Sequence, residues 1–97
     1  MAYLSLNRIV GDPRALLGAY HRTEPVMTGV GRDHGLILHA AAGTPDGLLI
    51  VNLWPSATAS RAAAEDPRRV AVIGEHGLRP AQFRGEHHDV DNYVLFP

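Results

Sequence analysis

The centre of the chain, residues 34–54, reads HGLILHAAAGTPDGLLIVNLW. Two apolar runs, 34–43 and 48–54, flank the tetrapeptide Thr44-Pro45-Asp46-Gly47. In such a tetrapeptide Pro presets φ, Asp tolerates the turn backbone and Gly accepts a positive φ. The stretch therefore predicts a β-hairpin.

The segment before this hairpin predicts a strand and a helix. Residues 3–10, YLSLNRIV, alternate with period two and favour a strand. Asp12-Pro13 supplies an N-cap acceptor and a Pro suited to the first helical position, so we expect a helix over 14–28. Pro25 removes a backbone donor and should kink or end this helix just before it, leaving residues 28–33 as a loop.

The segment after the hairpin predicts two helical pieces and a last strand. Ser56 offers an N-cap for an Ala-rich helix over 57–65, and Asp66-Pro67 repeats the helix start signal for a piece over 67–76. Residues 86–96, EHHDVDNYVLF, are rich in β-branched and aromatic types and predict a strand.

The order βαββαβ is that of the ferredoxin-like, split βαβ arrangement. We therefore expect an α+β fold in which a four-stranded antiparallel sheet carries both helices on one face. The chain has 97 residues and no long linker, so we expect one domain over 1–97.

Composition excludes several classes of protein and of site. The net charge of -1 argues against a nucleic-acid or membrane-surface binder, which needs a basic face. Without Cys there is no disulfide or thiolate metal site, and all nine cations are Arg, so a Lys nucleophile is excluded. We find no signal peptide, membrane span, metal motif or cofactor motif, and we expect a cytoplasmic protein with no cofactor and no metal.

Side-chain alternation along the expected strands leaves no face of the sheet polar enough to be solvated. An antiparallel sheet with one wet face alternates apolar and polar residues, whereas here one parity is almost wholly apolar and the other has only a few polar groups near its middle. Two helices cover one face, so we expect a second copy of the chain to cover the other and the protein to be a homodimer. The first set is Leu4, Leu6, Val10, Leu36, Leu38, Ala40, Leu49, Val51 and Leu53; the second is Tyr3, Ser5, Asn7, Ile9, Ile37, His39, Ala41, Leu48, Ile50, Asn52 and Trp54.

The element order, Asn7-Arg8 on the first strand and the junction Leu53-Trp54-Pro55-Ser56 carry a family resemblance. The chain resembles the dimeric α/β-barrel superfamily, and within it the antibiotic-biosynthesis-monooxygenase-like branch. The resemblance implies two sheets packed face to face into a barrel, with a pocket between helices and sheet in each subunit. It also implies an activity related to cofactor-free monooxygenases of aromatic polyketides or to polyketide cyclases.

Haem-degrading members of that superfamily use a first-strand Asn, a Trp on the second helix and a His further along. Asn7 matches the first of these, but Ala63 and Ile73 occupy the other two positions. We therefore expect no haem.

Histidines and amides carry the chemistry that remains available. His39, Asn7 and Asn52 share the inward parity, and His39 is suited to abstract a proton while the amides hold a developing oxyanion. The alternative is a core His39 that is bonded to Asn52. His87-His88 gives one His to each face of the last strand, and we take His88 as a second proton carrier, with a solvated strand start as the alternative.

Further candidates come from aromatic and basic residues. Tyr20 and Trp54 are candidates for substrate binding, with core packing as the alternative for both. Arginines scattered among Asp and Glu indicate a solvated face rather than an anion site. They are Arg68, Arg69, Arg79 and Arg84.

Two functions follow from these residues taken together with the activities that the resemblance implies. The first is a small cofactor-independent enzyme of secondary metabolism, monooxygenase-like or cyclase-like, that acts on a hydrophobic aromatic or polyketide-type molecule. The second is a non-catalytic dimer that binds a small apolar ligand or serves as a structural partner. A cavity on which His39, Asn7 and Asn52 converge favours the first.

Overall fold

The hairpin at the centre of the chain forms from β2 (Leu38–Thr44) and β3 (Gly47–Trp54) in the computed structural model, which describes residues 1–97. β1 (Tyr3–Val10) pairs with β3 on one side and with β4 (Phe83–Asp89) on the other. The strand order is β2-β3-β1-β4, with every neighbouring pair antiparallel. The four-stranded antiparallel sheet expected from the sequence is confirmed.

The first helix is longer than the sequence predicted. α1 (Pro13–Asp33) is capped by the Asp12 carboxylate, which accepts from the Ala15 amide at 2.9 Å, and it continues through Pro25. Of the two effects expected from Pro25, a kink or an end of the helix, the end does not occur, and the loop expected over 28–33 is wrong. A Pro inside a helix costs about 3 kcal/mol, but this helix buries residues on both sides of Pro25, and tertiary packing of that face outweighs the cost.

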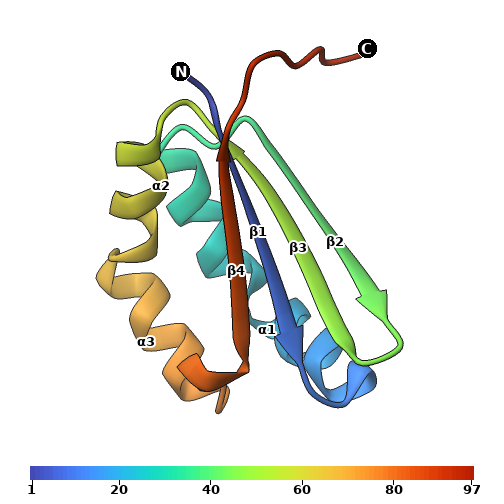
Figure 1. Ribbon diagram of the computed structural model, residues 1–97. Coiled ribbons are helices and arrows are strands. Elements are labelled where there is room, and N and C mark those ends of the chain that lie inside the picture. The colour runs from blue at the N-terminus through green and yellow to red at the C-terminus, as the bar shows by residue number, and fades with distance from the viewer.

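The two later helices begin where the sequence predicted. α2 (Ala57–Ala64) starts after Ser56, whose hydroxyl accepts from the Ala59 amide, and α3 (Pro67–Glu75) starts after Asp66. A single 3-10 turn, η1 (Pro80–Gln82), then leads into β4. All three α-helices lie on one side of the sheet (Figure 1).

The last strand is shorter and earlier than expected. β4 begins at Phe83 and ends at Asp89, which lies opposite Tyr3 at the start of β1. One more backbone hydrogen bond follows, from the Val90 amide to the Ala2 carbonyl at 2.9 Å, and residues 91–97 then leave the sheet as an extended tail (Figure 1). The expectation of a strand to residue 96 is therefore wrong.

The buried core is divided into two small clusters at opposite ends of β3. Leu48, near its start, packs with Ile9 and Leu16; Trp54, at its end, packs with Val30 and Ala63. All four of the other cluster members come from β1 or the helices, so both clusters lie between the sheet and its helices. The sheet face that looks toward the helices is thus the mixed one.

The opposite face of the sheet carries the aliphatic set of β1, β2 and β3, and no helix covers it (Figure 1). Arg8 and three side chains of β4, Arg84, Glu86 and His88, add charged groups at one side of this face. Leu38 is 41% exposed and Val10 is 42% exposed on this face. Four apolar side chains of the C-terminal tail are exposed as well: Tyr93, Val94, Leu95 and Phe96. No helix combines the length and the apolar character needed to cross a membrane.

Two glycines at the β2–β3 hairpin test the packing of this turn. A Cβ at Gly47 would collide with the backbone carbonyl of Ile9 on β1, whereas a Cβ at Gly43 would meet nothing within 4 Å. We expect Gly47→Ala to lower the free energy of unfolding by about 2 kcal/mol or more, because backbone cannot move aside cheaply. Gly43→Ala, the matched control, should change it by less than about 1 kcal/mol.

Urea unfolding followed by circular dichroism measures both variants. Equal stability of Gly47→Ala and Gly43→Ala would show that the hairpin does not lie this close to β1.

Candidate functional site

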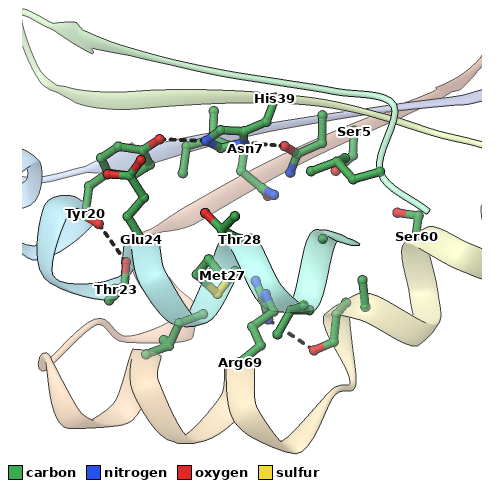
Figure 2. Close-up of a pocket in the computed structure, with 18 of the residues that line it drawn as sticks. Ser5, Asn7, Tyr20, Thr23, Glu24, Met27, Thr28, His39, Ser60 and Arg69 are labelled. Carbon is green, nitrogen blue, oxygen red and sulfur yellow. Dashed lines mark hydrogen bonds between the residues drawn. The ribbon is translucent and has the colours of Figure 1, made fainter. Parts of the chain in front are cut away.

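A cavity of about 600 Å³ lies between the inner face of the sheet and the helices (Figure 2). This is within the range of small-molecule sites, roughly 300–1,000 Å³. Just over half of the residues that line it are hydrophobic, and they include members of both core clusters. The apolar side chains of the core therefore surround this cavity and do not fill the whole space between sheet and helices.

A row of four polar side chains crosses the inner face of the sheet at one level. The strand register aligns His39 of β2 with Asn52 of β3, Asn52 with Ser5 of β1, and Ser5 with His87 of β4. All four line the cavity. We call these four residues the polar row. Each of the four strands thus contributes one hydrogen-bonding side chain to the cavity wall at the same height of the sheet.

His39 is hydrogen-bonded through both of its ring nitrogens. Its Nδ1 lies 2.6 Å from Oδ1 of Asn52, and its Nε2 lies 2.6 Å from the hydroxyl of Tyr20. Since an amide oxygen only accepts, Nδ1 carries the proton, and Nε2 of the neutral ring accepts from the Tyr20 hydroxyl. The three groups form a chain in which a proton can pass from Tyr20 to His39.

Tyr20 reaches this position from α1. Its ring stacks on that of His39, with the centroids 5.8 Å apart and the planes 13° from parallel. Burial raises the pKa of the Tyr20 phenol, and the nearby carboxylate of Glu24 raises it further. The phenol therefore stays protonated near neutral pH and donates to His39.

Asn7 extends from β1 into the cavity, two residues along the strand from Ser5 of the polar row (Figure 2). It lies opposite Ile50 on β3 and Gly85 on β4, neither of which has a polar side chain. None of the side-chain hydrogen bonds of the structure involves its amide, so both the amide N–H groups and the amide oxygen are free to bind a guest molecule.

The same architecture occurs in solved structures of low sequence identity. Rv0793 from Mycobacterium tuberculosis matches with a TM-score of 0.74 and 13% identity, over 98% of this chain and 100% of that one. A monooxygenase from Streptomyces coelicolor, the ActVA-Orf6 product in complex with nanaomycin D, matches with a TM-score of 0.70 and 16% identity, over 99% and 92%. A dimeric ferredoxin-like protein of unknown function from Jannaschia sp. matches with a TM-score of 0.74 and 11% identity, over 93% and 100%.

The chain has the ferredoxin-like fold. This confirms the fold that the sequence resemblance implied, which is also the fold of antibiotic biosynthesis monooxygenase-like proteins. No family model and no curated protein matches the sequence.

Most of the residues expected at the site line the cavity of this ferredoxin-like fold, but one does not. Those that do are His39, Asn7, Asn52, Tyr20 and Trp54. His88 lies opposite Leu4 on β1 and therefore faces the other side of the sheet, where its Nε2 is 3.3 Å from the Glu86 carboxylate. His87, opposite Ser5, takes the inward position instead, and its ring stacks on Tyr3.

Two charged residues of the cavity wall were missed by the sequence reasoning. Glu24 follows Tyr20 by one helical turn, and Arg69 precedes the buried Val72 and the adjacent Ile73 by one turn. Arg69 lines the cavity rather than the solvated face to which we assigned it, whereas Arg68 is exposed and paired with Asp33 and Asp66. Helical spacing of three and four residues would have placed both missed side chains.

The remaining histidines stabilise the framework. His34 bonds to the Asp66 carboxylate at 3.0 Å, and His76 donates from Nδ1 to the Val72 carbonyl at 2.9 Å. His21 is exposed, 3.7 Å from Glu24. No three His, Asp or Glu side chains come together as the ligands of a metal ion would.

The environment of Tyr20 predicts its titration. We expect the phenol to ionise above the ordinary pKa of tyrosine and Glu24→Gln to lower that pKa, because the variant removes the carboxylate charge that opposes ionisation. Ultraviolet absorbance of tyrosinate against pH measures the shift, and Tyr20→Phe assigns the signal. An unchanged pKa in Glu24→Gln would mean that the carboxylate does not act on the phenol.

Proposed function

We propose that the chain is a cytoplasmic, cofactor-independent enzyme that removes a proton from a hydrophobic aromatic or polyketide-type molecule held in the cavity. The observation that carries this proposal is the hydrogen-bonded chain from Tyr20 through His39 to Asn52, set in the wall of a largely apolar cavity. An apolar site with a few convergent polar groups is the usual form of a small-molecule site.

Two protons move in concert along this series of hydrogen bonds. An acidic phenol or β-dicarbonyl of the substrate gives its proton to the Tyr20 oxygen, while the Tyr20 proton passes to Nε2 of His39. The products are a substrate anion and an imidazolium whose Nδ1 proton still binds Oδ1 of Asn52. Proton transfer by a positioned side chain contributes typically 10²–10⁴-fold to a rate, as an order-of-magnitude estimate.

Amide groups are available to hold the resulting anion. Asn7 has its whole amide free, and Asn52 has its amide N–H groups free while its oxygen accepts from His39. Donors aimed at the place where negative charge develops lower the barrier to forming it. His87 is the second proton carrier in this arrangement, because it takes the inward position that we expected for His88. Trp54 is part of the apolar lining of the cavity.

Structural neighbours support the reaction class. They include SnoaB, a cofactor-independent oxygenase from Streptomyces nogalater, with a TM-score of 0.60 and 17% identity, over 97% of this chain and 94% of that one, and the monooxygenase that binds nanaomycin D. A substrate anion that reacts with dioxygen as co-substrate gives a monooxygenase-like reaction. The same anion attacking its own carbonyl carbon gives a cyclase-like reaction, and both begin with the proton transfer described above.

A non-catalytic, ligand-binding dimer is the second candidate. The observation in its favour is that both ring nitrogens of His39 are satisfied within the protein, as in a histidine with a purely structural role. This candidate predicts binding of an aromatic ligand without turnover.

We also propose that the chain, as one domain over 1–97, forms a homodimer through the uncovered sheet face. Across β1, β3 and β2 this face is aliphatic, as at the level where Leu6 lies beside Val51 and Val51 beside Ala40. Burying several hundred Å² of such a surface in each subunit, at about 25 cal/mol per Å², contributes on the order of 10 kcal/mol, which is comparable with the net stability of a small domain. The exposed apolar tail and the dimeric structural neighbours support the same assembly.

Replacement of His39 tests the enzymatic proposal. With 1,8-dihydroxyanthrone and dioxygen as substrates, which would give the anthraquinone and water, His39→Gln should lower the rate by about 10²-fold or more, because the proton acceptor is lost. His21→Gln is the matched control and should retain the rate, since His21 is exposed and outside the cavity. Absorbance of the quinone and consumption of dioxygen measure turnover.

The outcomes separate the two candidates. Binding of nanaomycin D without turnover by the wild-type protein would favour the ligand-binding dimer. Equal rates for His39→Gln and the wild type would remove His39 from the mechanism.

Replacement of Val51 tests the homodimer. The wild-type chain should sediment at twice the 10.5 kDa of one chain, and Val51→Glu should shift it to the monomer, because a carboxylate would be buried in the apolar interface. Val70→Glu, on the exposed surface of α3, introduces the same charge and should remain dimeric. A monomeric wild-type protein at micromolar concentration would contradict the proposal.

A further inference from the structure

Arg69 places a positive charge in the wall of the cavity, on the side opposite the sheet. It extends from α3 toward the space beneath Asn7, while His39 reaches the same space from the sheet (Figure 2). Its guanidinium is half-buried, and burial lowers its pKa relative to a free arginine. The side chain is therefore partly removed from water.

This cation has no counter-ion in the chain. Its only hydrogen bond runs from Nη1 to the carbonyl of Ala64 at the end of α2, 3.1 Å away, and none of the ion pairs of the structure includes it. A guanidinium has five N–H donors, so four remain available. A partly desolvated charge without a partner costs free energy that an anionic ligand would recover.

Two other charged side chains line the cavity, and neither balances Arg69. Arg32 is exposed and carries the same sign. Glu24 lies close enough to Tyr20 to act on its pKa, and no ion pair joins it to Arg69. The cavity is thus polarised, with negative charge beside Tyr20 and an unpaired positive charge on α3.

We propose that Arg69 is an anion subsite that binds the carboxylate of an aromatic acid whose opposite end reaches the Tyr20–His39 pair. This rests on the proposed function for the identity of the reacting end, but the binding of the carboxylate is independent of turnover. A planar guanidinium binds a carboxylate through two parallel hydrogen bonds, which would fix one end of a flat molecule. Glu24 disfavours the reverse orientation, because it would repel the carboxylate.

A carboxylate fits this subsite better than a phosphate does. The wall offers a single half-buried cation within a largely apolar lining, and no further N–H donor cluster accompanies it. A singly charged group on an aromatic ring satisfies both the cation and the apolar surface, whereas a phosphate monoester would bring a second uncompensated charge.

A matched pair of ligands tests the subsite. The probes are 6-hydroxy-2-naphthoic acid and its primary amide, which have nearly the same shape and differ in charge near neutral pH. We expect the wild-type protein to bind the acid about tenfold or more tightly than the amide, as a charged hydrogen-bonded pair would. Isothermal titration or the intrinsic fluorescence of the naphthalene measures both affinities.

Substitutions then assign the preference to Arg69. Arg69→Gln should weaken binding of the acid about tenfold or more and leave binding of the amide unchanged, while Arg69→Lys, which keeps the charge, should retain part of the preference. Arg61→Gln removes an exposed charge on α2 and Arg32→Gln removes the exposed charge at the cavity wall; both should change the preference by less than about twofold.

Several results would overturn the subsite: equal binding of the two probes, binding of neither, a preference that survives Arg69→Gln, or one that disappears in Arg32→Gln instead. Because the comparison of the two probes on the wild-type protein needs no variant, it decides the question even if Arg69→Gln does not fold. Absence of turnover together with a preference for the acid would contradict the proposed enzyme and support the subsite.

Discussion

The polar row across the inner face of the sheet is the constraint on which the rest of this structure depends. His39, Asn52, Ser5 and His87 lie at one level of four adjacent strands, on the face that would otherwise hold the centre of the core. Polar groups cannot be buried against aliphatic side chains without hydrogen-bond partners. Apolar packing is therefore confined to the two ends of β3, and a cavity remains between them.

This hollow core has a consequence for the other face of the sheet. A chain of 97 residues buries a limited apolar area even when its core is filled, and here a cavity occupies part of that core. The aliphatic side chains of β1, β2 and β3 on the outer face supply apolar surface that the inner face lacks. In the dimer that we propose, the candidate site and the assembly are therefore coupled, because the face with the candidate site contributes less to packing.

Much of the fold followed from the sequence because its signals were local. The turn at Thr44-Pro45-Asp46-Gly47 and the N-caps at Asp12, Ser56 and Asp66 each act within a few residues, and the structure places elements accordingly. The errors arose where distant packing decides the outcome. α1 passes through Pro25 because its face is buried on both sides, and β4 stops at Asp89, which lies opposite the first residue of β1.

The candidate site was predictable in part for the same reason. Parity within each strand separates His39, Asn52 and Asn7 from the aliphatic side chains of the same strand. The three then share a face because the aliphatic sets of the strands are aligned. Choosing between His87 and His88 required the pairing of β4 with β1, which no local signal in the sequence provides. Arg69 was misassigned because we considered its charged neighbours rather than its spacing from Val72 and Ile73 on the same helix.

The division of the polar row between central and edge strands bears on how such a site can change in evolution. Ser5 and Asn52 belong to the central strands β1 and β3 and are buried or half-buried, while His39 and His87 belong to the edge strands β2 and β4 and are exposed. Substitutions at exposed positions usually alter stability by about 0.5 kcal/mol or less. The two histidines to which we assign proton transfer thus lie at exposed positions of edge strands, so these positions can change while the packing of the central strands is kept.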